Sequence, residues 1–112
     1  MITWWEGQVD NGGYGGGTGV IVDSAYREIA RVRAANGYQS DLHEFVITSR
    51  GTAVIAVYNA VAADLSSVGG AVDGRVVEGI VQEIDISSRR LLFEWHSLDH
   101  VGLDESYRGL PD

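Results

Sequence analysis

Residues 42–58 read LHEFVITSRGTAVIAVY, and this stretch decides the fold class. Two β-prone runs, LHEFVIT and TAVIAVY, flank the short turn signal Ser-Arg-Gly. In the first run His43, Phe45 and Ile47 alternate with polar or smaller residues, which is the period of a strand with two different faces. The stretch therefore predicts an antiparallel hairpin.

Similar runs lie on both sides of this hairpin. They are separated by turn residues and span residues 19–23, 27–34, 76–86 and 91–96. Residues 26–35 also contain good helix formers, but we favour a strand because Ile29 and Val32 are β-branched. The sequence predicts an all-β fold, an antiparallel meander of about six strands.

The 112 residues are enough for a single domain spanning 1–112. We expect a Gly-rich N-terminal segment over 1–18, antiparallel strands over 19–96 and an irregular tail over 97–112. The glycines at positions 12–19 do not follow the G-x-G-x-x-G spacing of a phosphate loop, so we predict a mobile loop before the first strand.

The strands fall into two groups. Residues 42–96 look like one four-stranded unit, and residues 19–34 look like the last two strands of an earlier unit. Four-stranded units in series are typical of β-propeller blades, so the chain resembles about one and a half blades. Such a sheet has unpaired edges and an apolar face, and we expect oligomerisation to cover them.

Composition excludes several function classes. The chain has 16 acidic residues and 8 basic ones, for a net charge of −8, which disfavours binding to nucleic acid. It has no cysteine, and all basic residues are arginine, so zinc–thiolate sites, Walker A loops and lysine Schiff bases are excluded. We expect no metal and no cofactor.

Membrane and export signals are not visible in the sequence. The longest apolar stretch is Thr52–Leu65, which is shorter than the ~20 residues of a membrane span. The N-terminus has no basic and apolar leader, which predicts a cytoplasmic protein that does not contact membranes. If the chain is part of a secreted parent, it is instead extracytoplasmic.

An ordered series of segments resembles a known family. These segments are ITWWEG (2–7), DSAYRE (23–28), DLHEF (41–45), ADLS (63–66), QEID (82–85) and LFEWHSLDHV (92–101). Together they resemble the arylsulfotransferase-like family, over about residues 2–107. The family consists of β-propeller proteins of several hundred residues, often secreted or membrane-anchored, so this chain resembles an internal fragment of one.

The resemblance implies a chemistry. Arylsulfotransferases move a sulfuryl group from an aryl sulfate to another phenol through a histidine nucleophile, and further histidines and arginines bind the sulfate oxygens. His43 in the DLHEF segment is the best match to a family histidine that faces the central funnel. The family's nucleophilic histidine lies in a later His-Ile-Asn type segment, which does not occur in this sequence.

The residues themselves give a short set of site candidates. His43 is the catalytic candidate, and the adjacent Glu44 points to the opposite strand face, so adjacency gives no acid–base pair. The candidates for ligand binding share a cationic or aromatic side chain: Arg27, Arg31, Trp95, His96 and His100. The alternative is that the arginines are solvated and paired with carboxylates, that Trp95 packs in a core or interface, and that both histidines lie in a loop or on the surface.

Three functions remain open. We favour a free-standing homo-oligomer, a dimer or higher, that binds a small anionic or aromatic ligand and is not catalytic alone. The alternative is a fragment of an arylsulfotransferase-like enzyme. A third reading is an active small sulfotransferase with His43 or His96 as nucleophile.

Overall fold

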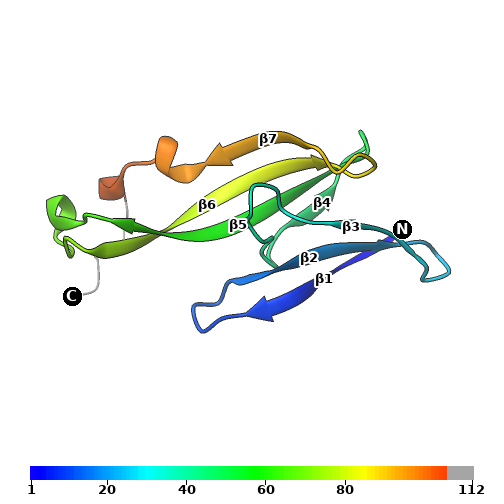
Figure 1. Cartoon of the computed structure of the whole chain (residues 1–112), viewed down its shortest axis with the longest axis horizontal. Helices are drawn as coiled ribbons and strands as arrows, with labels where there is room; N and C mark the ends of the chain where they lie inside the picture. The colour runs from blue at the N-terminus through cyan, green and yellow to red at the C-terminus, as the bar shows by residue number, and fades with distance from the viewer. Residues whose placement is uncertain (106–112) are drawn as a thin grey trace.

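The computed structural model describes residues 1–105 and is all-β, as predicted (Figure 1). It has seven strands: β1 (Ile2–Val9), β2 (Gly15–Val22), β3 (Glu28–Val32), β4 (Phe45–Ile47), β5 (Thr52–Ala63), β6 (Gly74–Asp85) and β7 (Leu91–His96). Three short 3₁₀ turns lie at Ser66–Val68, Ser97–Asp99 and Leu103–Glu105. The part of the predicted tail beyond residue 105 lies outside the described residues.

The strands form two antiparallel sheets. One has the order β1-β2-β3, and the other has the order β4-β5-β6-β7, which is the four-stranded unit expected over 42–96. The structure has seven strands where about six were predicted, because the earlier unit has three strands instead of two. The choice of a strand over a helix for residues 26–35 is confirmed by β3.

The glycine segment 12–19, predicted as a loop, lies largely in a strand, because β2 begins at Gly15. Strand β1 pairs with β2 in continuous register from Ile2–Val22 to Val9–Gly15, so most of the segment 1–18 is a hairpin. Two neighbours leave no room for a Cβ there: at Gly7 or Gly17 it would come within 2.5 or 2.8 Å of the Trp5 indole, and as close or closer to the backbone of the paired strand. The glycines therefore leave room for the large aromatic side chain of Trp5 to lie against the strands.

The core lies between the two sheets. Ile21 and Val32 of the three-stranded sheet pack with Ala53, Ile55 and Ile84 of the four-stranded sheet. All five are almost completely buried, and they come from alternating strand positions whose side chains point to the facing sheet. Burial of this apolar surface holds the sheets face to face.

One short segment is hydrogen-bonded to both sheets. The Ser40 carbonyl accepts the backbone N–H of Gly17 at 2.9 Å and the Trp5 indole N–H at 3.0 Å, so it belongs to the first sheet. The next N–H, that of Asp41, donates to the Ala56 carbonyl of β5 at 2.7 Å. The Ser40-Asp41 step therefore fixes the position of the segment that carries His43.

A buried side chain makes a second link. The carboxamide of Gln82 on β6 accepts the Ala35 N–H at 2.8 Å and donates to the Ala35 carbonyl at 3.2 Å. It also donates to Glu94 at 2.6 Å. Because Ala35 follows β3, this amide joins the end of the first sheet to the middle of the second.

The molecule is elongated. Its radius of gyration is 16.4 Å, compared with about 13 Å for a compact domain of similar length. Figure 1 shows the reason: the β5–β6 hairpin extends well past the three-stranded sheet. In the described part of the chain β1 and β7 each pair with one strand, so each has a free edge.

Candidate functional site

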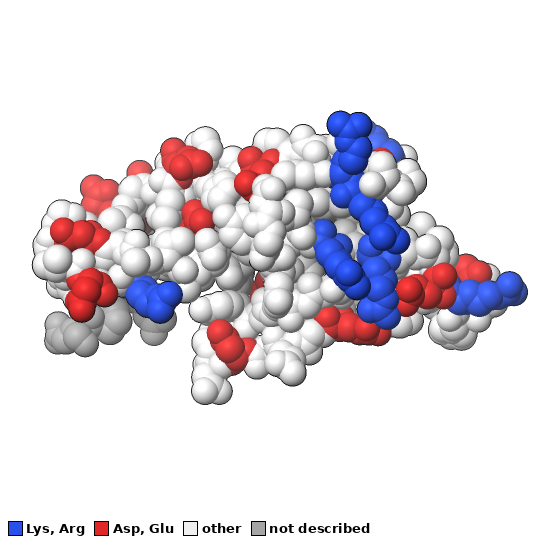
Figure 2. Space-filling view, viewed as in Figure 1, with Lys and Arg blue, Asp and Glu red and all other residues white. Residues whose placement is uncertain are grey.

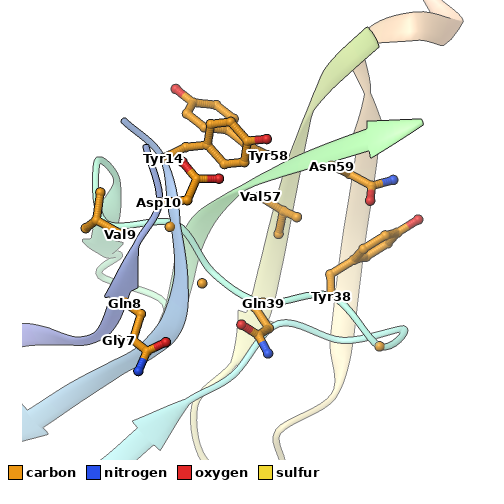
Figure 3. A pocket seen from close by; sticks show the side chains of 13 residues that line it. Gly7, Gln8, Val9, Asp10, Tyr14, Tyr38, Gln39, Val57, Tyr58 and Asn59 are labelled. Atoms are coloured by element: carbon orange, nitrogen blue, oxygen red, sulfur yellow. The ribbon is translucent and has the colours of Figure 1, made fainter. Parts of the chain in front are cut away.

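The candidate site is a groove between the β1–β2 hairpin and strand β5 (Figure 3). It has a volume of about 830 Å³, which is in the range of small-molecule sites. In Figure 3 Tyr14 and Tyr58 lie together at one end, while Tyr38 and Gln39 lie toward the other. The walls thus combine aromatic rings with uncharged amides, including Asn59.

The aromatic end of the groove continues to His43. The rings of Tyr14 and Tyr58 meet edge to face, with centroids 5.7 Å apart. On its other side Tyr58 is 5.9 Å from the His43 imidazole, at a tilt of 38°. His43 therefore lies behind the tyrosine wall, and its side chain is half exposed.

His43 is held by a buried carboxylate. Its Nδ1 is 2.5 Å from Oδ2 of Asp41, and its backbone N–H donates to the same oxygen at 2.8 Å. The other carboxylate oxygen accepts the Gly15 N–H at 2.7 Å. Because an ionised Asp41 can only accept, this contact requires the proton on Nδ1, and in a neutral imidazole the Nε2 lone pair is then free.

The charge on Asp41 is maintained by these hydrogen bonds. Burial alone raises the pKa of this carboxyl, but the N–H donors of Gly15 and His43 and the His43 ring outweigh it. The net effect is a lowered pKa for Asp41. In this loop, which is bonded to both sheets, the buried carboxylate of Asp41 thus orients the imidazole of His43.

A second histidine lies near the other end of the groove. The His96 imidazole is between two carboxylates, with Nδ1 at 3.2 Å from Glu78 and Nε2 at 2.9 Å from Glu94. The hydrogen bond to Glu94 is the main reason that the pKa of His96 is raised. Tyr38, which lines the groove, packs edge-on against His96 with centroids 6.2 Å apart.

The two predicted histidines are therefore at opposite sides of one groove, each behind a tyrosine that lines it. Asn59 connects the groove wall to the carboxylates around His96, because its side-chain amide donates to Glu78 at 3.2 Å. Neither imidazole lines the groove itself; each contacts a tyrosine that does.

The other predicted ligand residues lie elsewhere. Trp95 and His100 stack in parallel, with ring centroids 5.1 Å apart, and neither lines the groove. Arg31 is paired with Glu6 and Glu28, both at 2.9 Å, which matches the alternative of a solvated, paired arginine. Arg27 lies in the exposed turn before β3 and does not join the other candidates.

Metal and membrane sites were also sought in residues 1–105. No group of three or more His, Asp or Glu side chains there has the geometry to hold a metal ion. None of the helical turns in this range approaches the length and apolar character of a membrane span.

Sequence reasoning missed the residues that shape the site. Tyr14, Tyr38 and Tyr58 come from distant parts of the chain and meet only through sheet packing. Asp41 was overlooked in favour of Glu44, although its i, i+2 spacing to His43 is a readable signal for a residue that shares a side with the histidine.

Comparison with known proteins gives one match. The sequence model of a family described as arylsulfotransferase (ASST) matches residues 1–108. No curated protein and no solved structure was found to be similar. The match spans both sheets, the groove and both oriented histidines.

Proposed function

This chain belongs to the arylsulfotransferase family, and we propose that it binds a small aromatic, phenol-like ligand in the groove beside His43. The observation that carries the proposal is the aromatic wall of Tyr14 and Tyr58, which continues to the imidazole of His43. A phenol ring stacks on such a wall, and its hydroxyl finds hydrogen-bond partners in the amides of Gln39 and Asn59.

The proposal extends to assembly. The face of the four-stranded sheet that points away from the core carries six apolar residues in two cross-strand rows, and Glu83 interrupts one row: Val46, Val54, Phe93, Ala56, Val81 and Trp95. Val46 and Phe93 are 50% and 52% exposed, and they are the two ends of one cross-strand row that runs through Val54 and Glu83. We propose that other copies of the chain cover this face, with the sheets acting as blades of a β-propeller.

Ligand binding is tested with 4-nitrophenol in a calorimetric titration of the purified chain. Removing an aromatic wall by Tyr58→Ala is expected to weaken binding about tenfold, because a stacked ring contributes roughly 1 kcal/mol or more. The control is Tyr26→Ala, at an exposed turn far from the groove. Equal affinity of the Tyr58 variant and the wild type would reject the groove as the binding site.

Assembly is tested by light scattering during size-exclusion chromatography. We expect a dimer or higher oligomer for the wild type and dissociation for the double substitution Val46→Ser with Phe93→Ser. A wild-type chain that elutes as a monomer at all concentrations would refute the oligomer while leaving the ligand proposal standing.

A second candidate function is sulfuryl transfer, and the Asp41–His43 pair favours it. With Nδ1 protonated and bonded to Asp41, the free Nε2 of His43 is the nucleophile. Nε2 would form a bond to the sulfur of an aryl sulfate while the bond from sulfur to the phenolate oxygen breaks. The oxygen of an acceptor phenol would then take the sulfuryl group, and the histidine would return to its starting state.

The catalytic candidate is tested by nitrophenol release from 4-nitrophenyl sulfate in the presence of a phenol acceptor. His43→Ala is expected to abolish release, and Asp41→Asn is expected to reduce it by a factor of 10² or more, since the tautomer is no longer fixed. His100→Ala is the matched control, because His100 stacks on Trp95 away from the groove. If His43→Ala releases nitrophenol at the wild-type rate, His43 is not the nucleophile.

A further inference from the structure

A smaller cavity lies along β3, where the β6–β7 turn approaches that strand. Its volume is about 200 Å³, and the side chains of Arg31, Arg33 and Arg89 line it with Glu28. Arg31 belongs to β3, Arg33 follows that strand, and Arg89 is in the β6–β7 turn. Three arginines thus line one small space, and two of them, Arg33 and Arg89, have exposed side chains.

Two of these three arginines have no carboxylate partner. Arg31 is committed to Glu6 and Glu28, each at 2.9 Å, and Glu28 is thereby neutralised. Within residues 1–105, neither Arg33 nor Arg89 forms an ion pair. The cavity therefore has an excess of positive charge that no carboxylate of residues 1–105 compensates.

This excess is notable in so acidic a chain. The net charge is −8, yet Figure 2 shows arginine side chains in a continuous band at one end of the molecule. Acidic side chains dominate the opposite end in the same view. Like charges repel, so a band of this kind in the presence of many unused carboxylates indicates that it serves an external anion.

The backbone of Arg89 supports the same reading. Its φ is 64°, a left-handed conformation that glycine adopts without strain and that other residues adopt at a cost. The turn is closed by the Arg89 N–H to the Asp85 carbonyl at 2.8 Å, which needs no arginine side chain. The presence of an arginine instead of a glycine at position 89 is thus explained by its side chain, because Arg89 lines the cavity.

The arginine cavity is separate from the groove. The two share no lining residue. His43 contacts Tyr58, whereas the β4–β5 turn at the arginine end precedes Thr52, six residues earlier on β5. At ~3.3 Å per residue these points are about 20 Å apart along the strand.

We propose that the cavity lined by Arg33 and Arg89 is a binding site for a tetrahedral oxyanion, sulfate or phosphate. Guanidinium groups bind such oxygens through paired N–H donors, and a space of this size holds one such group with little room for more. Arg31 contributes to the local field while staying bonded to its two carboxylates. The site is independent of the proposed ligand groove and does not require it.

The test is a calorimetric titration of the full chain at low ionic strength, with inorganic sulfate in one arm and inorganic phosphate in the other. We expect one saturable site in at least one arm, and the arm with the lower Kd identifies the anion. Arg89→Gly is expected to weaken binding at least about tenfold, since one charge-assisted interaction is lost. The same substitution is expected to leave the melting temperature equal or higher, because it relieves the left-handed arginine.

Two further variants make the result decisive. Arg33→Gln removes the other unpaired guanidinium and is expected to weaken binding by a similar factor. Arg75→Gln is the matched control, because Arg75 lies at the far end of β6 and lines a different cavity. Absence of saturable binding for both anions at up to about 10 mM overturns the proposal, as does equal weakening by Arg75→Gln.

Discussion

Nδ1 of His43 lies 2.5 Å from Oδ2 of Asp41, a carboxylate with no exposed surface. The same carboxylate accepts the backbone N–H of Gly15, the first residue of β2. One buried charge therefore orients the imidazole and fixes the start of a strand 26 residues earlier in the chain. The candidate site and the fold share this residue.

Asp41→Asn is expected to reduce the free energy of unfolding at neutral pH by about 1–3 kcal/mol, since charge-assisted hydrogen bonds become neutral ones. The pKa of Asp41 is lower in the folded state than the ordinary value of 3.8. Its stabilising contribution is therefore present above pH 3.8 and is lost as the pH falls through the lower folded-state pKa. Urea unfolding of both proteins over a pH series checks this: the difference between them should shrink in acid, and a constant difference would contradict the assignment.

His96 predicts the opposite pH dependence. Its pKa is raised above 6.5, mainly by the hydrogen bond to Glu94, so its contribution is complete below pH 6.5 and is lost as the pH rises through the folded-state pKa. The wild type should therefore lose thermal stability in this window, and His96→Gln should show a flatter profile. His100→Gln, which leaves the carboxylate contacts intact, is the control. An NMR titration that places the His96 pKa at or below 6.5 would refute the prediction.

Gly17→Ala is expected to destabilise the fold by about 1–3 kcal/mol, in the range of overpacked sites. The added Cβ would lie 2.8 Å from the Trp5 ring and closer still to the backbone of the neighbouring strand, which has little freedom to move. Gly79→Ala is the matched control in β6, because its nearest neighbour would be the Ser97 hydroxyl at 3.9 Å. Melting temperatures of the two variants decide the matter: equal losses would show that strand glycine, not the indole, sets the requirement.

Gln82→Leu is expected to lower the free energy of unfolding by roughly 2–4 kcal/mol. The substitution keeps an apolar side chain of similar size but leaves the buried N–H and carbonyl of Ala35 without their partner. Gln39→Leu, at an exposed position, is expected to change stability by less than about 0.5 kcal/mol. Denaturant unfolding curves measure both, and a Gln82 variant as stable as the wild type would show that this amide does not hold the sheets together.

The sequence predicts the four-stranded sheet well because its signal is local. Period-two alternation around Phe45 and Ile55 and the short turn between them determine which side chains face the core. The first hairpin was missed for a physical reason: glycine normally weakens strands, and its role here depends on Trp5, which lies across from Gly19 on the neighbouring strand. The strand propensity of the individual residues does not reflect that contact.

The candidate site was predicted in part. His43 and His96 were singled out by residue type, and both lie beside the groove. The tyrosines of the groove were not, since their proximity depends on how one sheet docks on the other. The arginine cavity was not predicted either, because Arg33 and Arg89 are more than fifty residues apart and line one space only in the folded chain.

The Ser40-Asp41 step, bonded to β2 on one side and to β5 on the other, has a consequence for dynamics. Any opening between the sheets must break the bonds on one side of this step, so it disturbs the segment that carries Asp41 and His43 and dissolves one wall of the groove at the same moment. The N–H of Asp41 should then exchange with solvent deuterium as slowly as the amides of β5. A ligand in the groove would slow the exchange of the Asp41 amide and of the β5 amides together. The Asp41 amide would then report both ligand occupancy and opening between the sheets.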